Sequence, residues 1–222
     1  MSDLATLTGG FPYPDARRRL VSVILPLYNE ATTLPELLRR LGAVADGVSR
    51  DYTFEFLCVD DGSTDDTRQV AERLCMSDER ITIVALRRNY GQTAALQAGF
   101  DQARGDMILS MDADLQHFPE DIPLFLHKLD EGYDVVCGWR ADRREGVIRR
   151  WPSAAANWLI RKLTGMAIHD IGTTFRVYHG DFARQLQLLG EHHRFIPVLA
   201  GHLGARLAEV PIRNIQRPAG QL

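Results

Sequence analysis

The stretch "DMILSMDADLQHFPE", residues 106–120, joins a short apolar run to an acidic turn. The apolar run predicts a buried strand, and Asp112 and Asp114 follow it directly. Burial of an unpaired carboxylate is costly. The pair therefore lies either in a solvated turn or beside a positive charge. For an isolated Asp-x-Asp the solvated turn is the commoner case, so the rest of the sequence has to decide between these two interpretations.

Apolar runs alternate with helix-like segments on both sides of this stretch. The runs that predict strands cover residues 20–26, 54–60, 81–87, 106–112 and 133–139. Helical spacing of apolar residues predicts helices over 32–48, 67–75, 91–104 and 119–129, with Ser63 or Thr64 expected to cap the second. Strands that are apolar throughout indicate parallel pairing with both faces covered. The predicted fold class is α/β, a Rossmann-like, mostly parallel sheet with helices on both faces.

The alternation breaks after residue 140. An amphipathic helix is predicted over 144–165, followed by segments predicted as a strand, two helices and a final strand over 172–180, 181–190, 194–204 and 206–215. Residues 1–18 are rich in Gly, Pro and polar residues and indicate a loose leader. Residues 19–222 are predicted to form a single domain.

Composition narrows the function classes. The chain has 222 residues, 45% of them hydrophobic, and a formal net charge of -3, so it has no overall attraction to nucleic acid. Of its three cysteines, Cys58 and Cys137 lie in apolar runs and are predicted to be buried thiols. No secretory signal and no apolar run of about 20 residues is visible.

Polar residues gather where the predicted strands end. In open parallel sheets, ligands bind beyond these carboxyl ends. Asp112 and Asp114, with the amide oxygen of Gln116, can present oxygens to one Mg²⁺ or Mn²⁺. In "VDDGST" one carboxylate can accept hydrogen bonds from a base or ribose, and Pro26 and Tyr28 of "PLYNE" can wall a base pocket.

In this order and at these strand ends, the motifs resemble the family-2 glycosyltransferases. Within the family, the chain is most similar to the polyprenol-phosphate glycosyltransferases, the group that includes dolichol-phosphate mannose synthase. The resemblance covers roughly residues 20–220. It is carried by "LPLYNE", "VDDGSTD", "RRNYGQTAALQAGF", "DADLQHFPE" and "EVPIRNIQRPAG".

The resemblance implies an A-type glycosyltransferase fold and an inverting, metal-assisted enzyme. The donor would be a nucleotide-sugar, with UDP slightly favoured over GDP, and the cation Mg²⁺ or Mn²⁺. The acceptor would be a polyprenyl phosphate, undecaprenyl or dolichyl, reached at the cytoplasmic face of the membrane. The predicted helix over 144–165 would then lie near the acceptor and the membrane surface.

Site roles follow from the resemblance by position. The residues implied to hold the nucleoside are Pro26, Tyr28, Glu30, Val59, Asp61 and Asp112. Those implied to bind the metal are Asp112, Asp114 and Gln116. The catalytic set is Asp112, Asp114, Arg140 and Arg217. The residues implied for the acceptor phosphate are Arg140, Arg176, Arg213 and Arg217.

The chemistry agrees with this assignment. A metal and arginines stabilise the charge that develops on a diphosphate leaving group. A lipid phosphate is already anionic at neutral pH, so it needs cationic groups and no general base. Relatives typically continue the last motif as Gly-x-Ser-Lys, whereas this chain ends "AGQL". We therefore expect a membrane region to follow residue 222 in the full protein.

Three alternatives remain open. A family-2 transferase acting on a saccharide or protein hydroxyl would need a base carboxylate, and between residues 165 and 180 only Asp170 is available. A sugar nucleotidyltransferase would have a Gly-rich basic loop where this chain has "PLYNE". A non-catalytic nucleotide-sugar-binding module would be expected to lack the metal ligands.

Overall fold

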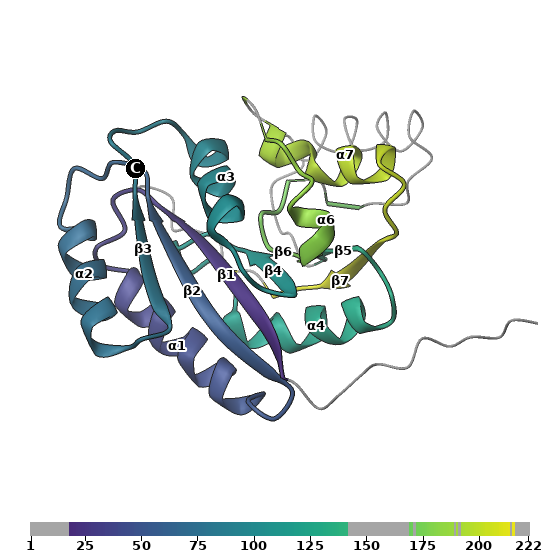
Figure 1. Ribbon diagram of the computed structural model, residues 1–222, viewed down its shortest axis with the longest axis horizontal. Coiled ribbons are helices and arrows are strands. Elements are labelled where there is room, and N and C mark those ends of the chain that lie inside the picture. Colours follow the sequence, from purple (N-terminus) through teal and green to yellow (C-terminus); the bar gives the residue numbers. More distant parts are fainter. Residues whose placement is uncertain are drawn as a thin grey trace, which may run out of the picture.

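The computed structural model describes residues 18–141, 169–170, 172–188, 190, 192–213 and 215. Within them, a single seven-stranded sheet carries helices on its faces (Figure 1). The strands are β1 (Arg19–Leu27), β2 (Tyr52–Asp60), β3 (Ile81–Ala85), β4 (Met107–Ser110), β5 (Val135–Trp139), β6 (Arg176–His179) and β7 (Leu207–Pro211). The helices are α1 (Leu34–Gly47), α2 (Thr67–Ser77), α3 (Gln92–Gln102), α4 (Ile122–Asp130), α6 (Gly180–Ala183) and α7 (Ile196–His202), with 3-10 turns η1 (Pro119–Asp121) and η2 (His192–Phe195).

The predicted leader, apart from Arg18, and the predicted helix over 144–165 lie outside the described residues. Among the residues that are described, no helix has both the length and the apolar composition needed to cross a bilayer.

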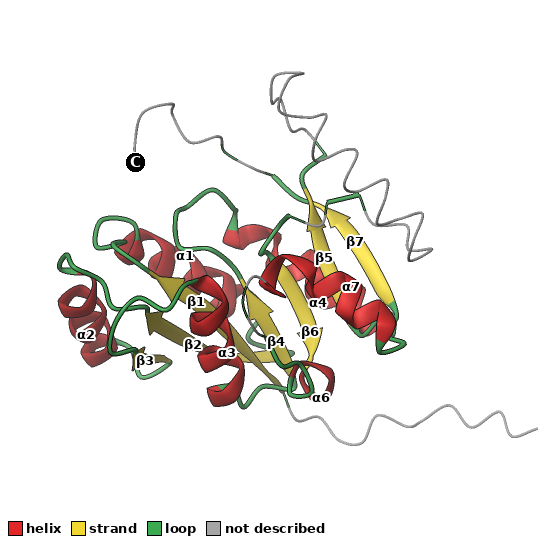
Figure 2. Cartoon of the chain, turned by 90° about the horizontal axis from the view of Figure 1, so that it is seen from above, coloured by secondary structure: helices red, strands yellow, loops and turns green. Residues whose placement is uncertain are grey.

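The strand order is β3-β2-β1-β4-β6-β5-β7 (Figure 2). The predicted parallel pairing is confirmed for β1 with β2 and β4, for β2 with β3, and for β5 with β7. β6, for which the sequence predicted a strand and no direction, lies between β4 and β5 and runs antiparallel to both, so the sheet is mostly parallel as predicted.

Side chains of alternate residues in the strands build two core layers, as the two-residue period of a strand requires. On one face, Val21, Val23 and Leu25 of β1 pack in a cluster with apolar residues of α1, α2 and α4. On the other face, Ile24 packs in a cluster with residues of α3, α6 and α7. Figure 1 shows the two helix layers on opposite sides of the sheet. The prediction of helices on both faces is confirmed.

The two cysteines predicted to be buried thiols are buried and free. Burial raises the pKa of the Cys58 thiol to about 12 and that of Cys137 to about 11. Both therefore stay protonated and serve the core as small apolar side chains.

The predicted cap of α2 was wrong. The helix begins at Thr67 after Asp66, and neither Ser63 nor Thr64 caps it. The Ser63 hydroxyl oxygen instead accepts a hydrogen bond from the Asn29 backbone amide at 3.1 Å. Ser63 and Thr64 therefore hydrogen-bond to Asn29, in the loop after β1, and do not cap α2.

A buried carboxylate joins the amino ends of the central strands. The Glu55 carboxylate accepts hydrogen bonds from the Ser22 hydroxyl at 2.5 Å and from the Arg104 backbone amide at 3.0 Å. The Arg104 guanidinium donates two more, at 2.9 and 2.6 Å. Burial by itself would raise the pKa of Glu55, but the hydrogen bonds from Ser22 and Arg104 outweigh it and lower the pKa. Ionised Glu55 therefore stabilises the fold.

We predict that Glu55→Gln lowers the free energy of unfolding at pH 7 by about 1–3 kcal/mol, because charge-assisted hydrogen bonds are lost. Since the pKa of Glu55 is lowered on folding, its contribution is present above its ordinary value of 4.5 and is lost as the pH falls through the folded-state value. Urea unfolding at several pH values should show that the difference in the free energy of unfolding between the two proteins shrinks as the pH falls below about 4. Glu36→Gln, on an exposed pair with Arg39, is the control and should leave the free energy of unfolding almost unchanged. A difference in unfolding free energy that does not change with pH would contradict the role given to ionised Glu55.

Candidate functional site

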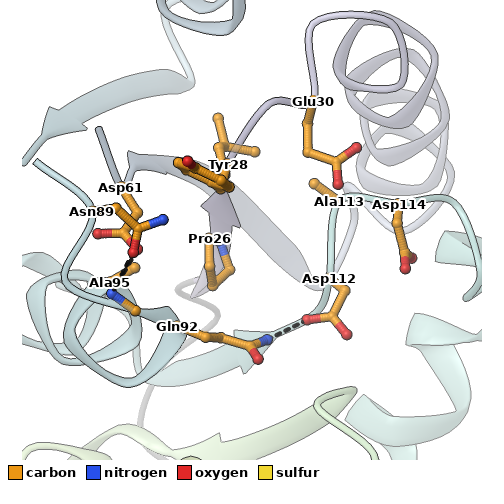
Figure 3. A pocket seen from close by; sticks show the side chains of 12 residues that line it. Pro26, Tyr28, Glu30, Asp61, Asn89, Gln92, Ala95, Asp112, Ala113 and Asp114 are labelled. Carbon is orange, nitrogen blue, oxygen red and sulfur yellow. Dashed lines mark hydrogen bonds between the residues drawn. The ribbon is translucent and has the colours of Figure 1, made fainter. Parts of the chain in front are cut away.

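A pocket of about 310 Å³ lies beyond the carboxyl ends of β1, β2 and β4. The strand registers bring these ends together, because Leu27 pairs with Asp60 on one side of β1 and Ile24 pairs with Ser110 on the other. The pocket is lined by Pro26, Leu27, Tyr28, Glu30, Asp61, Asn89, Gly91, Gln92, Ala95, Asp112, Ala113 and Asp114 (Figure 3). Six of the predicted site residues thus meet at one place: Pro26, Tyr28, Glu30, Asp61, Asp112 and Asp114.

The "PLYNE" turn is fixed against the "DGSTD" turn. Asn29 has a φ of 59°, a left-handed conformation that asparagine tolerates better than most residues. Its side-chain oxygen accepts a hydrogen bond from the Thr64 backbone amide at 2.8 Å. The Glu30 backbone amide donates to the Thr67 hydroxyl at 2.7 Å. These contacts set Tyr28 and Glu30 at the pocket, where the Tyr28 side chain keeps an exposed aromatic surface.

Asp61 organises the loop that follows β3. Its two carboxylate oxygens accept hydrogen bonds from the backbone amides of Tyr90 and Gly91, both at 2.8 Å. Gly62 packs on the same loop, with a φ of 68°. A Cβ at Gly62 would lie 2.4 Å from the Arg88 carbonyl carbon. A carboxylate offers about four lone-pair sites, so Asp61 can hold this loop and still accept a bond from a ligand.

Sequence reasoning missed the contribution of the loop after β3 and of the start of α3. Asn89, Gly91, Gln92 and Ala95 all line the pocket. Their motif, "RRNYGQTAALQAGF", and its place at a strand end were the available signals. None of these side chains titrates or stands out as a metal ligand, so the motif gave no reason to single one out.

Asp112 and Asp114 face the pocket from the turn after β4 (Figure 3). Asp112 Oδ1 accepts a hydrogen bond from Gln92 Nε2 at 2.6 Å, and Asp114 Oδ1 accepts one from the Gln116 backbone amide at 3.0 Å. The residue before Gln116, Leu115, has a φ of 59°, which makes this turn tight. The turn therefore holds two carboxylates with set orientations at one side of the pocket.

The charge of the lining suits a cation together with an anion. The described lining carries four acidic side chains, those of Glu30, Asp61, Asp112 and Asp114, and no lysine or arginine. Hard divalent cations take oxygen ligands and often keep only one or two protein carboxylates, with phosphate and water completing the shell. No group of three or more His, Cys, Asp or Glu side chains suited to a metal occurs among the described residues. The two carboxylates on one turn, those of Asp112 and Asp114, fit a cation whose remaining ligands come from phosphate and water.

His117 lies buried behind this turn. Burial lowers its pKa, an effect that the charge of Asp112 partly offsets, so the ring is neutral at pH 7. Its ring centroid lies 5.5 Å from that of Phe175. Its Nδ1 has no hydrogen-bond partner among the residues that the structure describes.

The remaining predicted residues lie outside the described pocket lining. Val59 is fully buried in the core layer that contains α3. Gln116 is half-buried, and its backbone amide contacts Asp114. Arg176 is buried in β6, where its Nη1 donates to the His193 carbonyl at 2.7 Å. Arg217 lies outside the described residues.

Two of the predicted phosphate-binding arginines are paired with buried acids. Arg140 Nε and Nη2 donate to the two carboxylate oxygens of Asp170 at 2.7 and 3.0 Å. Asp170 is only 6% exposed. Arg213 donates in a similar way to Asp121. Both guanidiniums are therefore held in set positions by carboxylates of this chain.

Residues 22–187 match the family model described as Glycosyl transferase family 2. The chain belongs to this glycosyltransferase family. The family resemblance predicted from the motifs is confirmed.

The chain is also similar to curated members of the family. It is 40% identical over 211 residues to the undecaprenyl-phosphate 4-deoxy-4-formamido-L-arabinose transferase of Pseudomonas aeruginosa (strain LESB58), a match that covers 95% of this chain and 61% of that protein. It is 41% identical over 209 residues to the Klebsiella pneumoniae transferase of the same name (subsp. pneumoniae, strain ATCC 700721 / MGH 78578), covering 94% of this chain and 63% of that protein. The chain thus spans less than two thirds of the length of these relatives.

Solved structures establish the fold. The chain is similar to glucosyl-3-phosphoglycerate synthase from Mycobacterium tuberculosis in complex with Mn²⁺, UDP-glucose and phosphoglyceric acid, with a TM-score of 0.70 and 20% sequence identity. The match covers 90% of this chain and 73% of that one. The predicted A-type glycosyltransferase fold is confirmed.

We predict that Gly62→Ala destabilises the protein more than Gly91→Ala. Both positions have positive φ values, 68° and 90°, that residues with a Cβ rarely adopt, so alanine strains the backbone at each by about 1–3 kcal/mol. Only at Gly62 would the added Cβ also clash with backbone, which adds roughly 1–3 kcal/mol. At Gly91 the added Cβ would meet no atom of the described residues within 4 Å. Urea unfolding of the two variants checks the order, and equal losses would contradict the close packing of Gly62 on the loop.

Proposed function

We propose that this chain is the catalytic region of an inverting glycosyltransferase that moves a sugar from a nucleotide-sugar, with UDP favoured over GDP, to a polyprenyl phosphate. The observation that carries the proposal is the single pocket in which the "PLYNE", "DDGSTD" and "DADLQ" residues meet. The names of the 40%-identical relatives, which act on undecaprenyl phosphate, support this acceptor class.

The donor would lie along this pocket. Tyr28 supplies an aromatic face for a base, and Asp61 and Asn89 supply polar groups beside it. The diphosphate would reach Asp112 and Asp114. Four acidic side chains in the lining would repel a diphosphate by itself, so the donor would bind with a divalent cation. The complex of a protein of the same fold with Mn²⁺ and UDP-glucose supports this arrangement.

Asp112 and Asp114 would hold the cation, Mg²⁺ or Mn²⁺, with Gln116 beside them. When bound, this cation neutralises charge on the leaving diphosphate. Gln92 fixes the Asp112 carboxylate, and the Gln116 backbone amide fixes that of Asp114, so neither has to reorganise during transfer.

The residues available at the acceptor distinguish transfer to a lipid phosphate from transfer to a hydroxyl. Transfer to a hydroxyl needs a base, and Asp170, the carboxylate considered for that role, is buried and bound by both arms of Arg140. Transfer to a phosphate needs none. An anionic phosphate oxygen would form the new bond to the anomeric carbon while the bond from that carbon to the diphosphate oxygen breaks. The nucleoside diphosphate would leave with the electron pair, and the anomeric configuration would invert.

Arginines would bring the two phosphates together. Arg140, held in place by Asp170, and Arg217 are proposed to contact phosphate. A lipid acceptor implies work at the membrane surface, and we propose its cytoplasmic face. The same residues suit a hydroxyl acceptor less well, since the carboxylate of Asp170 is already bound by Arg140.

We predict metal-dependent nucleotide binding. Calorimetric titration of UDP and of GDP should give binding of one nucleotide that requires Mn²⁺, and Asp114→Ala should weaken it by at least about 100-fold, because a ligand to the cation is lost. Asp181→Ala removes an exposed acid on α6 and should leave the affinity unchanged. Binding that ignores both the metal and Asp114 would contradict the site and favour a non-catalytic module.

We also predict that the acceptor must carry a phosphate. With the full-length protein in membranes and a radiolabelled nucleotide-sugar, transfer should occur to undecaprenyl phosphate and not to undecaprenol, because the uncharged alcohol needs a base that the site does not supply. Transfer to the alcohol at a comparable rate would favour the hydroxyl-acceptor alternative.

A further inference from the structure

The segment that follows β7 returns to the turn that carries Asp112 and Asp114. The Ile215 backbone amide donates to the Gln116 carbonyl oxygen at 3.0 Å. The Arg213 backbone amide donates to Asp121 Oδ2 at 3.1 Å. Residues 213 and 215 thus attach to both ends of the stretch from Gln116 to Asp121.

The contact at Asp121 is the stronger of the two. Nε and Nη2 of Arg213 both donate to Asp121 Oδ1, at 2.9 and 2.6 Å. The Asp121 side chain is 6% exposed, whereas that of Arg213 is 58% exposed. The Arg213 guanidinium also lies over the Phe118 ring, 4.7 Å from its centroid. Charge-assisted hydrogen bonds to a buried carboxylate fix the geometry at this point.

The contact at Gln116 leads directly to a proposed metal ligand. The Gln116 carbonyl accepts from Ile215, and the Gln116 amide donates to Asp114 Oδ1. The orientation of the Asp114 carboxylate therefore depends on the backbone around Gln116, which the segment after β7 holds in place.

We infer that Arg213 and Asp121 are positioning residues that orient the Asp114 carboxylate through the segment at 213–215. Arg213 would thus act by binding Asp121 of the same chain, whereas the sequence predicted that it contacts the acceptor phosphate. The inference rests on the proposed function, because it assumes that Asp114 holds the cation bound with the nucleotide. Partners outside the first ligand shell of a metal commonly change its affinity by about 10–100-fold.

A second ion pair on the same turn provides a matched control. Arg40 Nε of α1 donates to Glu120 Oε1 at 2.8 Å, and the Arg40 guanidinium lies 5.2 Å from the Phe118 centroid. Like Arg213–Asp121, this pair joins an arginine to an acid of the turn, and Glu120 is the residue next to Asp121. It holds the turn to α1 by a side-chain ion pair, and it interacts with Arg213 only through charge and the shared Phe118 ring in the interactions that the described residues show.

The test compares Arg213→Gln and Asp121→Asn with Arg40→Gln and Glu120→Gln. Calorimetry measures UDP affinity in Mn²⁺ and in EDTA, with GDP replacing UDP if the unchanged protein binds only GDP. We expect Arg213→Gln and Asp121→Asn to weaken the Mn²⁺-dependent affinity about 10-fold. The control pair should change it less than twofold, and Arg213→Lys, which keeps the charge, should restore part of the loss.

The outcomes separate this inference from the proposed function. If the unchanged protein binds neither nucleotide with Mn²⁺, the proposed function fails and the inference fails with it. If it binds and Arg213→Gln binds equally well, the inference alone is overturned. Equal losses in both pairs would also overturn it, because they would reflect general stability of the turn.

A second readout does not depend on a variant that might fold poorly. Hydrogen exchange of the unchanged protein, followed by mass spectrometry, reports on peptides that contain the amides of Arg213 and Ile215. Adding Mn²⁺ with the nucleotide should slow exchange there, because coupling between two sites is reciprocal. Unchanged exchange in these peptides, with the nucleotide bound, would overturn the inference.

Discussion

The pairing of β1 with β2 on one side and β4 on the other is the constraint on which the site depends. β1 has no exposed face, since its side chains alternate between the two core layers. Parallel neighbours on both edges end at the same border of the sheet, so three loops must leave it together. The acids after β4 and the aromatic turn after β1 meet because of this register, although more than 80 residues separate Tyr28 from Asp112 in the chain.

The second constraint is electrostatic. Acidic side chains collect in the pocket, while two of the arginines predicted to bind the acceptor phosphate are bound to buried acids, Arg140 to Asp170 and Arg213 to Asp121. The pocket is therefore complementary to a cation, and to an anion only when a cation accompanies it. The four acids of the lining would repel a phosphate that arrives without a metal. The paired arginines keep their positions, because each guanidinium is fixed by a carboxylate before any ligand arrives.

The sequence predicted the features that depend on residues close together in the chain, namely the strands and the motifs that follow them. Apolar runs located β1 to β5 with small errors at their ends, and the motifs after them supplied six lining residues. It could not predict contacts between distant segments. The direction of β6 depends on how the chain returns after β5, and the partner of Arg213 lies 92 residues away at Asp121. Asp61 was expected to face a ligand, and its backbone partners at residues 90 and 91 could be identified only from the fold.

The use of Asp61 to hold main-chain amides has a consequence for protein engineering. Because Asp61 bonds to the backbone at Tyr90 and Gly91, the path of the loop does not depend on which side chain residue 90 carries. Residues 87–90 are exposed, and Asn89 among them lines the pocket. Their side chains can therefore be exchanged as a library without disturbing the core. This short loop is the natural place to redesign the nucleobase preference that we propose for the pocket.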